Sequence, residues 1–182
     1  MTVKVAINGF GRIGRLVLRA IIESKRNDIS VVAINDLGSV EANAHLLSYD
    51  SVHGKLNSSV NVTSDGINTE HGNIKVFSER NPEDLPWGDL GIDITLECTG
   101  LFTKKDDANK HIIAGAKKVL ISAPGNGVDY TVVHGVNETG ITNDHKIISN
   151  ASCTTNCLAP VAKILNQVVG IESGFMTTVH AF

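Results

Sequence analysis

The chain has 182 residues, of which 42% are hydrophobic and 19% charged, and its formal net charge is −3. This composition is typical of a globular protein with room for one ordinary domain and the start of another. The mild negative charge argues against a protein that binds nucleic acid or a membrane surface, and the apolar stretches are too short to span a bilayer. With three cysteines and a start that lacks the pattern of a secretory signal, a cytoplasmic protein without disulfides is expected.

Apolar runs and helical patterns alternate along the first part of the chain, as in βαβ units around a parallel sheet. Residues 3–8 and 29–35 are mostly apolar and predict strands covered on both faces, with a helix over residues 13–22 between them. Residues 57–77 contain short alternating pieces broken by Asp-Gly and His-Gly pairs. These pieces predict small antiparallel strands inserted into the parallel pattern.

The α/β pattern then resumes. Further strands are predicted over residues 92–98, 118–122, 130–133, 146–149 and 175–182, and helices over residues 104–114 and 153–168. Pro160 should kink the last helix, whose apolar stripe consists of Leu158, Val161, Leu165 and Val168. The predicted fold class is α/β, a doubly wound and mostly parallel sheet with the start of a second domain, and the expected boundary lies near Asn150.

The segment Gly9-Phe10-Gly11-Arg12-Ile13-Gly14 fits the pattern G-x-G-x-x-G and lies between the first strand and the first helix. In a Rossmann unit these glycines give a tight turn, a close approach of the backbone to a pyrophosphate, and close packing of the helix on the strand. The helix N-terminus adds free N–H groups and a partial positive charge for the phosphates. The segment therefore predicts a dinucleotide site, and a glycine-rich turn without a ligand is the alternative.

Asp36 ends the second strand, about 20 residues after Gly14, which is the spacing at which an acidic side chain reaches the adenosine ribose. A carboxylate there accepts hydrogen bonds from both ribose hydroxyls and repels a 2′-phosphate, which favours NAD over NADP; a solvated turn residue is the alternative. Ligands of doubly wound sheets lie beyond the carboxyl ends of the strands. Two further strand ends are therefore candidate walls of the cofactor site, residues 98–102 with Thr99 and Gly100, and residues 122–124 with Ser122.

The segment Ser152-Cys153-Thr154-Thr155-Asn156-Cys157 follows an apolar strand and opens a helix. A thiolate at a helix N-terminus is stabilised by the helix dipole and by unpaired N–H groups, and the Cys153 N–H and nearby hydroxyls are candidate oxyanion donors. Cys153 is therefore the candidate nucleophile. Cys98 and Cys157 are expected to be buried, inert thiols, and C-x-x-x-C without a second Cys/His pair is poor zinc spacing, so no metal site is predicted.

A cysteine nucleophile needs a base. His180 lies in an apolar, strand-like run, where a histidine is often a satisfied core residue. The other six histidines have polar or turn surroundings and are interpreted as surface or structural residues: His45, His53, His71, His111, His134 and His145.

Three segments resemble the glyceraldehyde-3-phosphate dehydrogenase family in order and spacing, namely residues 8–15, 152–157 and 177–181. The resemblance covers the whole chain. It implies a glycolytic, phosphorylating, NAD-dependent oxidoreductase in which Cys153 attacks glyceraldehyde 3-phosphate to form a thiohemiacetal, while His180 polarises Cys153 and accepts the proton. Hydride then passes to NAD, and inorganic phosphate releases the resulting thioester as the acyl phosphate 1,3-bisphosphoglycerate. The resemblance also implies a homotetramer for the full-length form.

The resemblance further implies which residues form each site. It places Asn8, Arg12, Ile13, Asp36, Arg80, Thr99, Ser122 and Cys153 around the cofactor. It begins the substrate-phosphate site with Ser152, Cys153 and Thr154. Residues 1–150 correspond to the NAD-binding Rossmann domain, and residues 151–182 to the start of a truncated α+β catalytic domain.

The chain departs from the family pattern in two places. It stops at Phe182, where many members have Tyr and continue into most of a catalytic domain with further phosphate-binding residues. Leu37 follows Asp36 in place of the small polar residue of NADP-tolerant photosynthetic relatives, which supports NAD. Two alternatives stay open: an erythrose-4-phosphate dehydrogenase, which is similar over this region, and a truncated NAD-binding module without turnover.

Overall fold

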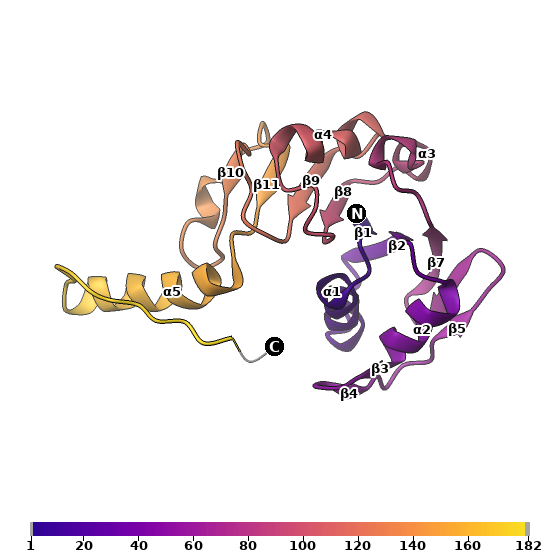
Figure 1. The fold of residues 1–182 in the computed structure, drawn as a ribbon, viewed down its shortest axis with the longest axis horizontal. Coiled ribbons are helices and arrows are strands. Elements are labelled where there is room, and N and C mark those ends of the chain that lie inside the picture. The colour runs from indigo at the N-terminus through magenta and orange to yellow at the C-terminus, as the bar shows by residue number, and fades with distance from the viewer. Residues whose placement is uncertain (1, 181–182) are drawn as a thin grey trace.

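The computed structural model describes residues 2–180, which form one nine-stranded sheet with helices on both faces and a separate two-stranded hairpin (Figure 1). The order across the large sheet is β10-β11-β9-β8-β1-β2-β7-β6-β5. Every neighbouring pair from β10 to β7 is parallel. The predicted doubly wound, mostly parallel α/β fold is therefore confirmed.

The elements have the following bounds. The strands are β1 (Val3–Asn8), β2 (Ile29–Asn35), β3 (Tyr49–Asp50), β4 (Gly54–Lys55), β5 (Asn61–Val62), β6 (Gly66–Thr69), β7 (Gly72–Phe77), β8 (Ile94–Glu97), β9 (Lys118–Ile121), β10 (Tyr130–Thr131) and β11 (Ile147–Ser149). The helices are α1 (Arg12–Glu23), α2 (Val40–Ser48), α3 (Trp87–Leu90), α4 (Lys105–Ile113) and α5 (Cys153–Val168), with 3₁₀ turns at Pro82–Asp84 and Glu138–Gly140.

Each face of the central strands has its own core, because successive side chains of a strand point to opposite faces. The core of one face joins the sheet to α1 and α2 and includes Val5, Ile7, Leu18, Ile34 and Leu47. The cores of the other face join the sheet to α3 and α4 and include Ala6, Ala33, Trp87, Ala108 and Val119. Both faces are therefore covered near β1, as the apolar sequences of β1 and β2 predict.

The order of the strands reverses beside β1. The chain passes from β1 through α1 to β2 on one side, and later places β8 and β9 on the other side. The reversal lies between β1 and β8. In a doubly wound sheet such a switch point opens a crevice for a ligand beyond the carboxyl ends of the strands.

The middle of the chain differs from the prediction in its pairing. The pairs β5–β6 and β6–β7 are antiparallel, as predicted, but β7 also pairs in parallel with β2 and so continues the main sheet. Helix α2 and the hairpin of β3 and β4 lie outside the predicted elements. The start of α2 nevertheless carries a capping signal, because Ser39 Oγ accepts a hydrogen bond of 3.2 Å from the Ala42 N–H.

The last predicted helix is confirmed and the last predicted strand is wrong. Helix α5 begins after Ser152, whose Oγ accepts the Thr155 N–H at 3.0 Å, and it continues through Pro160. Residues 175–180 form no ladder and run back toward the start of α5 (Figure 1). A strand needs a neighbouring strand for its backbone groups, and residues 2–180 offer none there. Ala181 and Phe182, the end of that prediction, lie outside the described residues.

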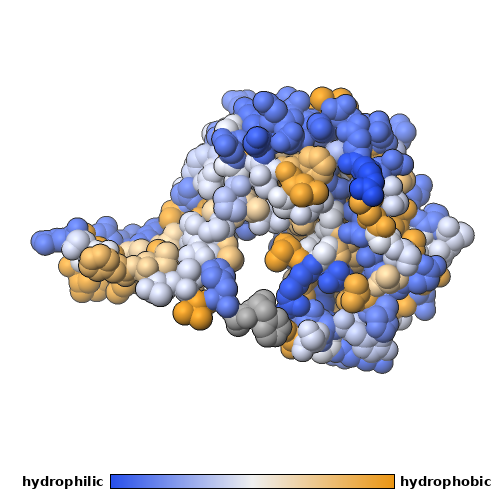
Figure 2. Space-filling view, viewed as in Figure 1, coloured by the Kyte–Doolittle hydropathy of each residue, from blue (hydrophilic) through white to orange (hydrophobic). Residues whose placement is uncertain are grey.

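Helix α5 projects from the sheet (Figure 1), and none of its residues is buried within residues 2–180. Figure 2 shows apolar side chains gathered along this projecting arm. The large apolar residues of the helix are between 42% and 75% exposed, namely Leu158, Val161, Ile164, Leu165 and Val168. The stripe is thus present as predicted, but residues 2–180 do not bury it.

Candidate functional site

Two hollows meet at the switch point of the sheet. The smaller one, about 350 Å³, is lined by residues that follow β1, β2 and β8, and we call it the glycine-loop pocket. The larger one, about 740 Å³, lies between α1, the adjoining face of β1, β8 and β9, and the start of α5, and we call it the cysteine groove. Cys98 lines both hollows. A ligand long enough to fill both would therefore pass this residue.

Each glycine of the loop has different surroundings: Gly9 lies in a tight turn, Gly14 lies where α1 contacts the loop, and Gly11 borders free space. Gly9 has a φ of +87°, and a Cβ there would lie 2.7 Å from the Thr99 nitrogen. A Cβ on Gly14 would lie 2.2 Å from the Gly9 oxygen, so α1 packs directly on the loop. A Cβ on Gly11 would meet no atom within 4 Å. The space in front of Gly11 is where the backbone can approach a pyrophosphate.

Asp36 joins the glycine loop to the end of β2. One carboxylate oxygen accepts the Phe10 N–H at 2.8 Å, and the other accepts the Gly38 N–H at 2.8 Å. Asp36, Leu37 and Arg80 all line the glycine-loop pocket. The carboxylate therefore braces the loop and faces the same pocket that the loop borders.

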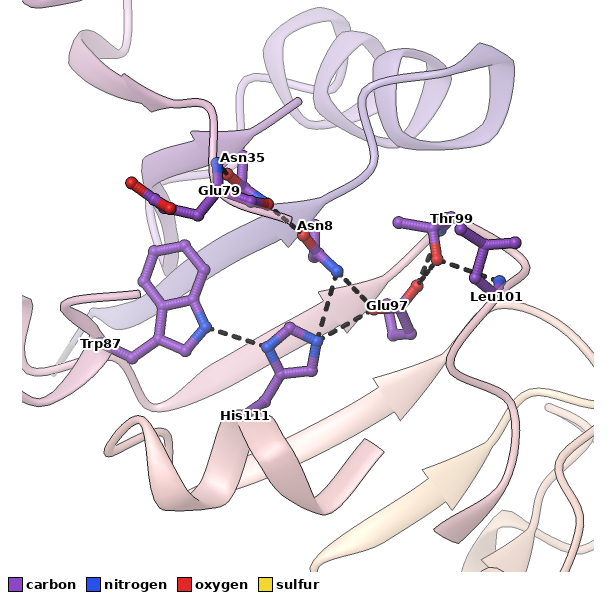
Figure 3. A network of polar contacts seen from close by, with 8 residues as sticks. All are labelled: Asn8, Asn35, Glu79, Trp87, Glu97, Thr99, Leu101 and His111. Carbon is purple, nitrogen blue, oxygen red and sulfur yellow. Dashed lines mark hydrogen bonds and ion pairs between the residues drawn. The ribbon is translucent and has the colours of Figure 1, made fainter. Parts of the chain in front are cut away.

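Buried polar side chains form a network behind this pocket (Figure 3). Asn35 Nδ2 donates to Asn8 Oδ1 at 2.7 Å, and Asn8 Nδ2 donates to Glu97 Oε2 at 2.6 Å. His111 Nε2 lies 2.9 Å from the same Glu97 oxygen, and Trp87 Nε1 donates to His111 Nδ1 at 3.1 Å. All five residues are at most 5% exposed.

A braced turn carries the chain from β11 to α5. Ser149 Oγ accepts the N–H groups of Gly125 and Ala151, both at 3.0 Å, and donates to the Ala123 carbonyl at 2.7 Å. Ala151 has a φ of +57°, in the left-handed region that a residue with a Cβ rarely adopts. Such strain is concentrated at functional sites and persists only where surrounding contacts hold it. The Ser149 contacts supply that support.

Asn156 fixes the same turn from inside the helix. Its Nδ2 donates to the carbonyls of Asn150 and Ser152, at 2.6 Å and 2.9 Å. Cys153 is the first residue of α5 and is exposed, and it lines the cysteine groove with Ser152. The thiol is therefore presented to the groove from the start of a helix.

The three thiols have different environments, and all are free. Cys98 is largely covered, and burial raises the pKa of its thiol to about 11. This agrees with the inert thiol expected there. Cys157 is exposed, so the expectation that it is buried is wrong for this chain, because α5 has no covering layer within residues 2–180.

His180 returns to the start of α5. Its Nε2 lies 3.4 Å from Thr154 Oγ1 and 3.0 Å from Thr178 Oγ1. No hydrogen bond within residues 2–180 joins the imidazole to Cys153 Sγ; the contact is made with the neighbouring residue. His180 is exposed, and not in a core strand.

Most of the site residues predicted from the sequence line one of the two hollows. The glycine-loop pocket is lined by Asn8, Gly9, Gly11, Asp36, Arg80 and Thr99. The cysteine groove is lined by Ile13, Ser122, Ser152 and Cys153. Neither hollow is lined by Arg12, Gly14, Gly100, Thr154 or His180. Arg12 instead forms an ion pair of 3.0 Å with Asp50.

Glu97, His111 and Trp87 have no counterpart among the predicted site residues. His111, grouped by its sequence with surface or structural histidines, is fully buried. A local signal did exist, because Glu97 is an acidic residue at the end of an apolar strand and Trp87 is the one tryptophan in the chain. Their convergence depends on the tertiary packing of α3 and α4 on the sheet, which periodicity does not reveal.

Metal and membrane features are absent from the part of the chain that is described. Residues 2–180 contain no group of three or more His, Cys, Asp or Glu side chains placed to hold a metal ion. Within the same range no helix has the length and apolarity needed to cross a bilayer.

Comparison with known proteins gives one consistent family. Residues 3–105 match the model of the glyceraldehyde 3-phosphate dehydrogenase NAD binding domain, and residues 152–182 match that of the C-terminal domain. The whole chain is 65% identical to a glyceraldehyde-3-phosphate dehydrogenase of Xanthobacter flavus, covering 54% of that protein. It is 59% identical to that of Cereibacter sphaeroides, again over 54% of the relative, and 55% identical to the chromosomal one of Cupriavidus necator, over 55%.

The chain spans about half the length of these curated relatives. The two family models match parts of it on both sides of the braced turn at Ala151. Together the glycine loop, the cysteine at the start of α5 and these matches show that the chain belongs to the glyceraldehyde-3-phosphate dehydrogenase family.

Proposed function

We propose that this chain supplies the NAD-binding part and the nucleophile of a phosphorylating glyceraldehyde-3-phosphate dehydrogenase. The observation that carries the proposal is the meeting of the glycine-loop pocket and the cysteine groove at Cys98. A dinucleotide that places its adenosine half beside Asp36 extends along the glycine loop toward Cys153. In this proposal residues 1–150 are the NAD-binding domain, and residues 151–182 begin the catalytic domain.

The residues of the glycine-loop pocket fit the adenosine half of NAD. The open front of Gly11 admits the pyrophosphate, and Asp36 offers acceptor capacity to ribose hydroxyls at the end of β2. Leu37, Leu101 and Phe102 add apolar surface to the pocket for a flat base. Ile13, Ser122 and Cys98 line the groove on the way to Cys153. We assign cofactor roles to Asn8, Gly9, Gly11, Arg12, Ile13, Gly14, Asp36, Arg80, Thr99, Gly100 and Ser122.

The proposed reaction is a nucleophilic catalysis by Cys153. His180 takes the thiol proton, the thiolate adds to the aldehyde carbon of glyceraldehyde 3-phosphate to form a C–S bond, and His180 returns the proton to the carbonyl oxygen to give a thiohemiacetal. Loss of a hydride from this carbon and of the hydroxyl proton to His180 leaves a thioester. NAD, when bound, supplies the acceptor for that hydride. Inorganic phosphate then displaces the thiolate and leaves as the acyl phosphate.

The start of α5 supports these steps. The first N–H groups of a helix have no partner within the helix, and they lie beside Cys153 where a negative oxygen develops. Ser152, Cys153 and Thr154 are the proposed beginning of the substrate site. The Thr154–His180 contact brings the proposed base within one residue of the nucleophile.

We further propose that the full-length protein is a cytoplasmic homotetramer. The three free thiols support a reducing compartment. The uncovered stripe of α5 supports burial against further protein.

The proposal is tested through its cofactor preference. Isothermal calorimetry of the 182-residue chain should give a dissociation constant for NAD at least about tenfold below that for NADP, because the Asp36 carboxylate repels a 2′-phosphate. Asp36→Asn removes the charge but keeps one acceptor for the Phe10 N–H, and it should narrow this difference. Equal binding of both cofactors by the wild type would contradict the proposal.

A further inference from the structure

The network behind the glycine-loop pocket has a buried carboxylate at its centre. Glu97 is 1% exposed, and one of its carboxylate oxygens lies 2.9 Å from Nε2 of His111, which is fully buried. Its other contacts are Asn8 and Thr99 (Figure 3). A buried carboxylate with this set of partners is stable only if the partners donate to it.

The direction of each hydrogen bond follows from two groups that can only donate. The indole N–H of Trp87 points at His111 Nδ1 at 3.1 Å, so Nδ1 carries a lone pair. The proton of a neutral His111 is then on Nε2 and is donated to Glu97 at 2.9 Å. On the other side the Glu79 N–H donates to Asn35 Oδ1 at 2.8 Å, which turns the Asn35 amide nitrogen toward Asn8.

The same logic continues from Asn35 to Glu97. Asn35 Nδ2 donates to Asn8 Oδ1 at 2.7 Å, so Asn8 Nδ2 faces Glu97 and donates at 2.6 Å. The N–H of Thr99 donates to the second carboxylate oxygen at 2.8 Å, and the Thr99 hydroxyl donates to it as well. Glu97 thus accepts from four donors, two on each carboxylate oxygen.

These bonds hold three segments of the pocket wall. Asn8, Asn35 and Thr99 all line the glycine-loop pocket. Thr99 Oγ1 also accepts the Leu101 N–H at 3.0 Å, which fixes the segment after β8. Because a Cβ on Gly9 would lie 2.7 Å from the Thr99 nitrogen, the glycine loop packs on the residue that Glu97 positions.

We propose that Glu97, oriented by His111 and Trp87, is a positioning residue for the adenosine half of the dinucleotide. The inference rests on the proposed function of the glycine-loop pocket. Neither His111 nor Trp87 lines this pocket. Trp87 holds His111, and His111 reaches the pocket wall through Glu97 and through the ring of Phe102, whose centroid lies 6.4 Å from that of the imidazole. Asn8 also has a positioning role, because its side-chain oxygen and nitrogen both form hydrogen bonds within the network.

The test compares two substitutions of His111, a residue outside both hollows. His111→Leu removes the donor to one oxygen of Glu97. The carboxylate should then shift toward another donor and carry with it Asn8 and Thr99 of the pocket wall. Because ADP-ribose binds only when the pocket residues return to their wild-type positions, part of the binding free energy is used for this rearrangement. The affinity for ADP-ribose should therefore fall about tenfold, the typical value of a lost hydrogen bond to a charged group. His111→Gln keeps an N–H donor near the position of Nε2 and should retain most of the affinity. Calorimetry of the 182-residue chain measures both.

Two comparisons separate positioning from general damage. The affinity for nicotinamide mononucleotide, which lacks the adenosine half, should be the same in His111→Leu and wild type. Ile112→Ala, also on α4 but outside the network, should lower the melting temperature and leave ADP-ribose binding unchanged. Equal ADP-ribose affinity of His111→Leu and wild type would overturn the positioning role alone. No ADP-ribose binding by the wild type would overturn the proposed function, and the positioning role with it.

A measurement without any ligand tests the orientation of the network even if His111→Leu does not fold. Long-range ¹H–¹⁵N spectra of the wild type near pH 7.5 should show His111 as the neutral tautomer with its proton on Nε2. Trp87→Phe removes the donor that holds Nδ1 unprotonated while Glu97 still accepts the Nε2 proton, so the spectrum should then contain the imidazolium, with a proton on each nitrogen. A wild-type imidazole protonated on Nδ1 would overturn the proposal.

Discussion

Cys153 differs from the other two thiols in both access and surroundings. It is exposed at the first position of α5, where unpaired N–H groups stabilise a thiolate. Cys98 is largely buried, and its raised pKa of about 11 keeps it protonated near neutral pH. Brief treatment with iodoacetamide at pH 7.5, followed by peptide mapping, should therefore modify Cys153 first.

The reactivity of Cys157 is the informative control in that experiment. Cys157 is also exposed, but it lies one turn inside the helix, where the backbone N–H groups are already bonded. Cys153→Ser should abolish the early modification and leave the slow reaction of Cys157. Faster labelling of Cys157 or Cys98 than of Cys153 would refute the assignment of the nucleophile.

Residues whose role depends on a single strand, turn or helix could be predicted from the sequence. Residues whose role depends on the packing of distant elements could not. Gly9, Gly14 and Cys153 have roles set by the strand, turn or helix that contains them, and a short motif records such roles. Glu97 and His111 meet only because α4 packs on the sheet beside β8. His111 has polar neighbours in sequence, so its complete burial has no local signature.

At the scale of elements, Asp129 ties α4 to β11. Lys105 Nζ lies 2.5 Å from one carboxylate oxygen, and the N–H groups of Lys146 and Ile147 donate to the other at 2.8 Å and 2.9 Å. The Lys105 hydrogen bond and the two backbone donors lower the pKa of Asp129 to about 2. The pKa of Asp in an unfolded chain is about 3.9. The stabilisation that the ionised Asp129 contributes is therefore complete well above that pH, and it is lost as the pH falls toward 2.

Asp129→Asn should therefore lower the free energy of unfolding by a constant amount above about pH 5. The difference between wild type and variant should shrink as the pH falls from about 4 toward 2. Urea titrations at a series of pH values measure this difference. Asp144→Asn is the matched control, because Asp144 is exposed and has no ion pair within residues 2–180. A difference that stays constant down to pH 2 would rule out the linkage.

Elements specified by a local sequence pattern were predictable, and elements that depend on contacts distant in sequence were not. β1, β2 and α5 match their predicted bounds closely, because an apolar run or a helical stripe specifies them. Residues 175–180 have the alternation of a strand but no neighbour to pair with, and they remain extended chain. The short hairpin of β3 and β4 is held by contacts distant in sequence, such as the buried Arg19 bonded to the Gly54 carbonyl at 2.8 Å.

At the scale of the whole molecule, the two halves of the site are bounded by different parts of the chain. The glycine-loop pocket is bounded by elements of one packed sheet. The cysteine groove has walls on the sheet and α1, and α5 contributes only Cys153 and Asn156 to it. The proposed cofactor site and the proposed nucleophile are thus described, while Cys153 itself is exposed within residues 2–180.

We therefore predict that the 182-residue chain binds NAD and oxidises glyceraldehyde 3-phosphate far more slowly than a full-length relative. Holding the reacting carbon against both the thiolate and the cofactor is worth up to about 7–11 kcal/mol in well-oriented systems. Within residues 2–180 the proposed substrate contacts are Ser152, Cys153 and Thr154 at the start of α5, and His180 contacts Thr154 and not the thiol.

The measurement is a pair of experiments on one preparation. Calorimetry first establishes that NAD binds, and the production of NADH is then followed with the aldehyde in the presence and absence of phosphate. Erythrose 4-phosphate serves as a second aldehyde, and Cys153→Ser gives the background. A full-length relative such as the Xanthobacter flavus enzyme provides the reference rate, and it shares 65% of the residues of this chain. Turnover equal to that reference would show that the elements around Cys153 in this chain already suffice to orient the substrate.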